Sequence, residues 1–106
     1  MIGGQVFSGY SDHFDAEVRL LILRAIAEQS SKTMSDKLMM YMFREYAIRK
    51  TIEYLRTQLT WLEEQGSAVR LSKAGDTFIA ELTQQGFNHL DRIAIIDGIA
   101  TPALPR

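Results

Sequence analysis

The sequence contains no cysteine among its 106 residues. This absence excludes disulfide scaffolds, thiolate zinc sites and cysteine nucleophiles. No apolar stretch approaches the roughly 20 residues that a membrane-spanning helix needs, so we expect no membrane association. The first residues, MIGGQVFSGYSDH, lack the basic start and the apolar run of a signal peptide, which favours the cytoplasm as the location.

Neither sign of charge dominates, since the chain has 12 basic and 13 acidic side chains. This balance argues against a strongly basic nucleic-acid binder. The charges are nevertheless uneven along the chain. Residues 32–73 carry eight basic and five acidic side chains, whereas the remainder carries four and eight. Two interpretations stay open: a DNA-facing element on an acidic body, or a chance fluctuation.

An apolar fraction of 46% and this length predict one globular domain with a single modest core. Residues 1–13 contain three glycines and no helical pattern, and we interpret them as an N-terminal arm. The domain itself is expected over residues 14–92. Residues 93–106 hold both prolines and are expected to form a tail that either lies along the domain or extends to a partner.

Apolar residues at helical spacing predict three helices before any strand, over residues 14–31, 34–47 and 51–66. The expected capping residues are Asp12 or Asp15 for the first helix, Ser35 for the second and Thr51 for the third, with Gly66 ending the third. The first helix is apolar on more than one side. Either it is central to the core, or its second face meets another subunit.

The period then changes from helical to alternating. Residues 68–72 and 77–82 predict two strands joined by a turn over residues 73–76. Thr83 is expected to cap a short helix over residues 84–94. The predicted fold class is therefore mainly α with a two-stranded β-hairpin, in the element order of a winged helix-turn-helix.

Several segments resemble a family of small proteins encoded in Mu-like phages and prophages, loosely described as ArsR-like winged-helix regulators. These segments are FDAEVRLLILRAIAEQ, LRTQLTWLEEQG, LTQQG and PALPR, and the resemblance covers residues 14–106. The family's run R-T-Q-L-x-W-L-x-E-Q-G is matched by Arg56, Thr57, Gln58, Leu59, Trp61, Leu62, Glu64, Gln65 and Gly66. Where the family has Leu-Val after the glycine, this chain has Ser67-Ala68. The resemblance implies a transcriptional regulator in a phage or prophage programme.

A winged helix-turn-helix inserts its third helix into the major groove and lays the hairpin over phosphates. The expected phosphate contacts come from Arg44, Arg49, Lys50, Arg70 and Lys73. The expected groove-facing residues are Thr51, Glu53, Tyr54, Arg56 and Thr57. The same residues also suit the solvated face of any amphipathic helix.

Specific DNA binders commonly use two half-sites, so we expect a homodimer. The residues expected at the dimer interface are Val6, Phe7, Tyr10, Leu20, Leu23 and Trp61. For Trp61, cover by a following strand or by the N-terminal arm is an equal alternative. A second hypothesis keeps the winged-helix scaffold without DNA binding, as an interaction module for a host or phage protein. The acidic balance and Glu53 favour it.

No pattern in the sequence predicts catalysis. The two histidines, His13 and His89, lie near opposite ends of the chain, and we interpret both as surface residues and not as metal ligands. The nucleophile pattern G-x-S-x-G does not occur, and Gly3-Gly4 is not followed by the Lys-Ser/Thr of a phosphate loop. The sequence therefore predicts a non-enzyme that needs no cofactor.

Overall fold

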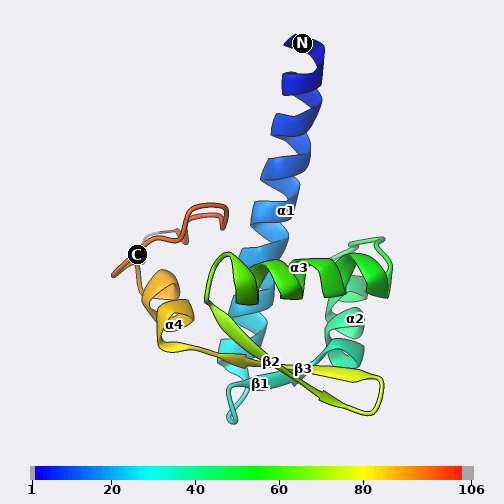
Figure 1. Ribbon diagram of the computed structural model, residues 1–106, viewed down its shortest axis with the longest axis vertical. Helices are drawn as coiled ribbons and strands as arrows, with labels where there is room; N and C mark the ends of the chain where they lie inside the picture. The colour runs from blue at the N-terminus through cyan, green and yellow to red at the C-terminus, as the bar shows by residue number, and fades with distance from the viewer. Residues whose placement is uncertain (1, 104–106) are drawn as a thin grey trace.

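The computed structural model describes the backbone of residues 2–103 and the side chains of residues 11–103. Within these residues the chain forms four helices and a small three-stranded antiparallel sheet, a small α+β fold (Figure 1). The elements are α1 (Ile2–Glu28), β1 (Thr33–Ser35), α2 (Asp36–Glu45), α3 (Ile52–Glu64), β2 (Val69–Ala74), β3 (Thr77–Leu82) and α4 (Gln84–Leu90).

Helix α1 is the central element of the core. It packs against the other three helices and against strands β1 and β3. Its apolar side chains are buried around most of the circumference, with Ile22, Leu23 and Ile26 fully covered. The core continues through side chains of the other elements: Met39, Phe43, Leu55, Leu59, Leu62, Val69, Ala80 and Leu82. The first interpretation of this very apolar helix, a central position, is therefore confirmed.

The expected beginning of α1 was wrong. The helix starts at Ile2, so residues 2–13 are helical and not an irregular arm, and neither Asp12 nor Asp15 caps its start. At 1.5 Å per residue, 27 residues span about 40 Å. This length matches the longest dimension of the molecule, 43 Å. In Figure 1 the N-terminal turns of α1 accordingly extend well beyond the other elements.

The caps predicted for the next three helices are confirmed. The hydroxyl of Ser35 accepts a hydrogen bond from the Leu38 amide at 3.1 Å, and Thr51 accepts one from the Tyr54 amide at 3.1 Å. Thr83 accepts a bond from Gly86 at 3.2 Å. Each bond satisfies an amide that the first helical turn leaves without a partner.

The end of α3 differs in detail from the prediction. Gly66 follows the C-cap residue Gln65, but the residue with a positive φ is Ser67, at 52°. Gly66 serves a different purpose, because an added Cβ would lie 3.3 Å from both the Leu62 carbonyl oxygen and the Trp61 ring. The tight fit explains the glycine at this position.

The predicted hairpin is confirmed, with a shorter turn than expected. Strands β2 and β3 pair antiparallel with Ala74 opposite Thr77, which leaves Gly75 and Asp76 as the connecting pair. Gly75 has φ +63°, which a two-residue turn demands at its first position and glycine supplies without strain. Strand β1 joins the other edge of β3 and gives the sheet order β1-β3-β2. Strand β1 was not predicted from the sequence.

The last helix is shorter than predicted, and the tail after it lies along the domain. Helix α4 ends at Leu90, and Arg92 then adopts φ +59°. The chain returns to α1, where the Ala100 amide donates to the Ala16 carbonyl oxygen at 3.1 Å and Ile99 is buried. Of the two alternatives for the tail, the described part up to residue 103 follows the first.

We expect Leu23→Ala to lower the free energy of unfolding by about 2–5 kcal/mol, because Leu23 is fully buried in the core. The matched variant Leu38→Ala shortens a leucine that is 45% exposed and should change stability by less than about 1 kcal/mol. Urea unfolding at two protein concentrations measures both. A loss for Leu23→Ala that disappears at high concentration would place this side chain at a subunit contact instead.

Candidate nucleic-acid interface

The segment between α2 and α3 is short and ends in two exposed basic residues. It turns at Ala47, whose φ is +57°, and runs through Arg49 and Lys50 into the cap Thr51. The ammonium of Lys50 lies 5.3 Å from the ring centre of Phe14 and 5.0 Å from that of Tyr54. Both cations therefore stand at the N-terminus of α3, where the helix dipole is positive and an anion is favoured.

The exposed face of α3 itself is acidic and polar. Glu53, Thr57 and Glu64 are exposed, and the Thr57 hydroxyl donates to the Glu53 carbonyl oxygen at 3.0 Å. Glu53 lies in the first turn and offsets part of the positive charge there, whereas Glu64 lies at the other end of the helix. Two of the predicted groove-facing residues, Glu53 and Thr57, do occupy this outer face.

Arg56 is half-buried, and its guanidinium is engaged by other parts of the protein. Its Nε lies 2.8 Å from Oδ2 of Asp36, and its Nη2 donates to the Asp76 carbonyl oxygen at 2.6 Å. The guanidinium also lies 4.6 Å from the ring centre of Phe78. Arg56 thus joins three elements: the start of α2, the middle of α3 and the tip of the hairpin. The arginine that was expected to face the groove therefore already has internal partners.

Tyr54 is likewise occupied within the protein. Its hydroxyl donates to Oδ1 of Asp15 on α1, and its ring lies 6.2 Å from that of Phe14. Burial and the bond to Asp15 raise the pKa of Tyr54 well above its ordinary value. The phenol therefore stays protonated at neutral pH and ties α3 to α1. It does not face outward as predicted.

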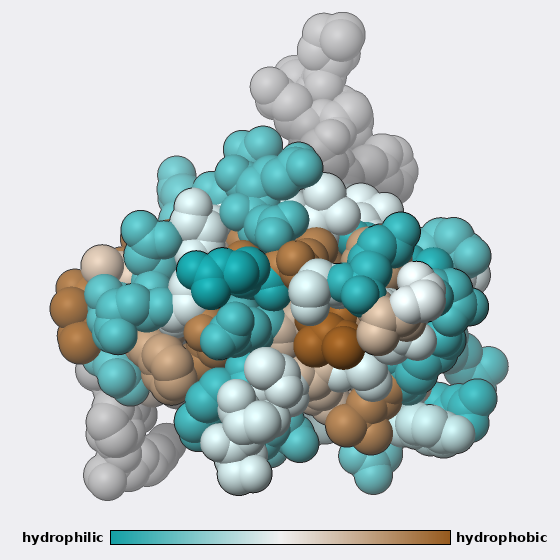
Figure 2. Space-filling model, turned by 60° about the horizontal axis from the view of Figure 1, so that its bottom comes forward, coloured by the Kyte–Doolittle hydropathy of each residue, from teal (hydrophilic) through white to brown (hydrophobic). Residues whose placement is uncertain are grey.

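The basic residues of the hairpin are partly balanced by acidic neighbours. Arg70 pairs across the strands with Glu81 at 3.5 Å, and Lys73 lies 5.1 Å from the ring centre of Phe78. At the tip, Lys37 of α2 pairs with Asp76 at 3.6 Å. Figure 2 looks onto the end of the molecule where the sheet lies, and this surface is largely hydrophilic with separate small apolar patches.

The three described residues expected at a dimer interface lie elsewhere. Leu20 and Leu23 are buried in the core, with exposed fractions of 4% and 0%. Trp61 is covered by the guanidinium of Arg19 at 3.9 Å and by Gly98, where an added Cβ would lie 2.5 Å from the indole. Cover of Trp61 by the tail was not predicted from the sequence. The side chains of Val6, Phe7 and Tyr10 lie outside the described residues.

Arg19 adds hydrogen bonds to its contact with the Trp61 ring. Its Nε donates to Oε1 of buried Gln58 at 2.8 Å, and its Nη1 donates to the Gly98 carbonyl oxygen at 2.9 Å. Burial lowers the pKa of Arg19, and the nearby carboxylate of Asp15 opposes that shift. Helix α1, helix α3 and the tail are therefore fastened together by one side chain.

His89 is fully buried, so the prediction of a surface histidine was wrong for this residue. Its Nδ1 accepts a bond from the Ile96 amide at 3.0 Å, which leaves Nε2 to donate to the Ala100 carbonyl oxygen at 2.9 Å. Both ring nitrogens thus hold the tail in place. His13 is exposed on α1 as expected. In the part of the chain that the structure describes, no group of three or more candidate ligands converges on a metal position.

No sequence pattern indicated Asp36 as the partner of Arg56. Asp36 follows a good N-cap, and that position alone accounts for an acidic residue in the first turn. Its 0% exposure arises because α3 and the hairpin close over it. The partners lie 20 residues apart, beyond the reach of helical spacing rules.

Comparison with known proteins gives no relative for this chain. No protein-family model, no curated protein and no solved structure matches it. Within the described residues, no helix is both long enough and apolar enough to cross a membrane.

We expect Arg56→Met to lower the free energy of unfolding by roughly 3–5 kcal/mol, because the variant leaves the carboxylate of Asp36 buried without a cation. Adding Asp36→Asn should recover part of the loss, since no charge then stays buried. The control Arg70→Met removes an exposed pair and should cost at most about 1 kcal/mol. Denaturant unfolding of the four proteins checks this. Equal, small losses for Arg56→Met and Arg70→Met would contradict it.

The raised pKa of Tyr54 makes stability fall at alkaline pH. Its contribution is fully present below about pH 10, where the unfolded phenol is still protonated, and is lost as pH rises toward the higher folded pKa. Tyr54→Phe should therefore flatten the fall in unfolding free energy that begins above about pH 10. Tyr41→Phe, at a residue 62% exposed, should leave the fall as in the native protein. Identical pH profiles for both variants would refute the assignment.

Proposed function

We propose that this protein is a winged helix-turn-helix DNA-binding protein. The support is the order of its elements: α2, a short turn and α3 form the helix-turn-helix, and β2–β3 forms the wing directly after α3. Strand β1 precedes α2 and pairs with β3, which completes a small sheet at the base of the wing. The observation that carries the proposal is the exposed pair Arg49 and Lys50 at the N-terminus of α3.

The proposed contacts are mainly to phosphates. Arg44 lies in the last turn of α2, and Arg49 and Lys50 follow in the turn, so the chain carries three cations in the stretch that leads to the positive end of α3. Lys73 and Arg70 extend the basic residues onto the wing. Arg and Lys at such positions fix a protein on the duplex and release counterions, without reading sequence.

Base readout is correspondingly limited. Of the five groove-facing candidates, Arg56 and Tyr54 are engaged in internal contacts, and the hydroxyl of Thr51 caps α3. Thr57 and Glu53 remain on the outer surface of the helix. A glutamate can accept a hydrogen bond from N4 of cytosine, and a threonine can contact a base or a thymine methyl group. We therefore propose modest sequence selectivity on a phosphate-dominated affinity. Action as a transcriptional regulator in a phage or prophage programme is the biological role that the family resemblance supports.

A second function is favoured by the charge of α3. Glu53 and Glu64 lie on its exposed face, where they repel phosphates and attract a basic surface. On this alternative the scaffold is an interaction module, and its partner is a host or phage protein with a positively charged face.

The DNA-binding proposal predicts that Arg49→Gln/Lys50→Gln weakens binding to duplex DNA of any sequence. The slope of log K against log salt is negative, and each lost phosphate contact should make it less steep by about 0.9. Fluorescence anisotropy with a mixed-sequence duplex at several salt concentrations measures the slope.

The matched control is Lys32→Gln/Arg92→Gln, which removes two positive charges from the end of α1 and the tail. Both side chains there bond backbone carbonyl groups, at Ala27 and Pro102, and lie outside the proposed contacts. The control should retain the native slope. No binding of the native protein at low salt, or equal loss in both double variants, would overturn the proposed surface.

A further inference from the structure

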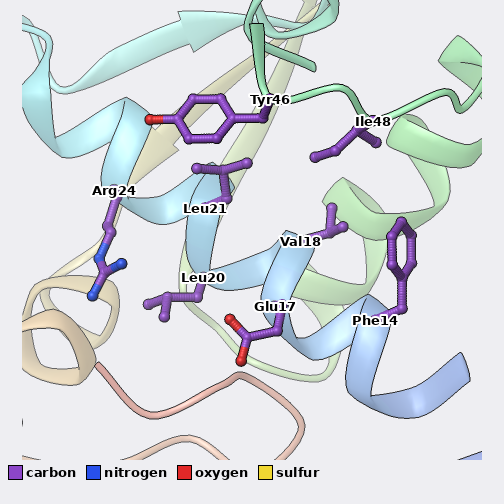
Figure 3. A pocket seen from close by; sticks show the side chains of 8 residues that line it. All are labelled: Phe14, Glu17, Val18, Leu20, Leu21, Arg24, Tyr46 and Ile48. Atoms are coloured by element: carbon purple, nitrogen blue, oxygen red, sulfur yellow. The ribbon is translucent and has the colours of Figure 1, made fainter. Parts of the chain in front are cut away.

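One face of α1 and the adjoining face of α2 form an apolar hollow at the surface. A groove of about 260 Å³ is lined by Phe14, Val18, Leu21, Tyr46 and Ile48, with Glu17 and Arg24 at its edge (Figure 3). A second hollow of about 510 Å³ shares Leu21, Arg24 and Tyr46 with the first and continues along α2.

The rim of this hollow exposes unusually large apolar groups. Leu38, Tyr41 and Tyr46 of α2 and its C-cap are 45%, 62% and 60% exposed. Clustered exposure of this kind marks an interaction site more often than chance, whereas single exposed apolar residues need no explanation. The lining residue nearest the N-terminus is Phe14. The earlier turns of α1 extend alone beyond the other elements (Figure 1).

Two charged side chains beside the hollow, Glu17 and Arg24, indicate the charge pattern that a partner must match. Glu17 and Arg24 are exposed, and neither has an ion-pair or hydrogen-bond partner among the described side chains. They lie seven residues apart on one face of α1, so about 10 Å of helix separates them and they cannot pair with each other. In Figure 3 both side chains point to the same side of α1, with Leu20 between them.

We propose that this face is the interface of a two-fold symmetric homodimer in which the α1 helices of two copies pack antiparallel. With the two-fold axis midway between Glu17 and Arg24, beside half-buried Leu21, Glu17 of each copy lies opposite Arg24 of the other. The same register places exposed His13 opposite exposed Glu28. A parallel arrangement would instead oppose Glu17 to Glu17 and Arg24 to Arg24. The charges therefore select the antiparallel arrangement.

The symmetry uses one patch twice, as an isologous interface requires. The apolar rim residues on α2 flank the helix pair and supply area toward the roughly 800 Å² per copy that a stable interface buries. Beyond the crossing, the projecting turns of α1 run past the end of the partner's helix. The inference does not rest on DNA binding, since it uses none of the cations at the start of α3.

Two opposite charge reversals test the register. Glu17→Arg gives a chain with two positive charges on this face, and Arg24→Glu gives a chain with two negative charges. Each variant alone should raise the dimer dissociation constant at least about tenfold, because like charges then meet twice per dimer. An equimolar mixture of the two should regain the native affinity, because every opposed pair is again of opposite sign.

Sedimentation equilibrium of the native protein, each variant and the mixture measures the association, with circular dichroism confirming that each variant is folded. Asp97→Arg, an exposed reversal on the tail, should dimerise like the native protein. A native protein that stays monomeric at 0.5 mM would overturn the proposal. So would single variants that dimerise normally, or a mixture that does not recover.

Discussion

The ion pair between Asp36 and Arg56 is the interaction on which the arrangement of α2, α3 and the hairpin depends. A carboxylate with no exposed surface is very costly unless a cation accompanies it, so Asp36 fixes where Arg56 must be. Arg56 then bonds the backbone of the hairpin tip at Asp76 and lies over Phe78. One side chain from the middle of α3 thereby sets the position of the hairpin relative to both helices.

This use of Arg56 limits which contacts the proposed DNA-binding surface can make. An arginine at the centre of a recognition helix is the usual reader of guanine, and here it is committed to internal contacts. Tyr54 is committed in the same way by its bond to Asp15. What stays outward is a pair of cations at the start of α3 and a mostly acidic face along the rest of the helix. Such a surface suits phosphate contacts close to the helix N-terminus and little base readout.

Local chemistry made much of the fold predictable. Helix starts were indicated by Ser35, Thr51 and Thr83, because short hydroxyl side chains can accept hydrogen bonds from the free amides of the first turn. The hairpin turn was indicated by Gly75. Two elements could not be predicted from the sequence, and each has a physical reason. Three residues of β1 are too few to show an alternating pattern. Residues 2–13 contain glycines and serines, which have low helix propensity, so the first turns of α1 were not predicted as helix.

The candidate site was less predictable than the fold. The exposed positions of Arg49 and Lys50 followed from the short turn, but the fates of Arg56, Tyr54 and Trp61 did not. Each is decided by a partner far along the chain: Asp36, Asp15, and the tail at Gly98 together with Arg19. Periodicity describes which face of a helix a residue occupies, and it carries no information on what closes over that face.

The central claim is that DNA meets the start of α3 and the wing, and it is tested most directly by titrating isotope-labelled protein with a duplex at low salt and following the backbone amide signals by NMR. The account predicts shifts concentrated at residues 49–54 and 70–76, with the amides of Leu21 and Tyr46 unaffected. Shifts centred on the groove between α1 and α2, or no shifts at any DNA concentration, would contradict it.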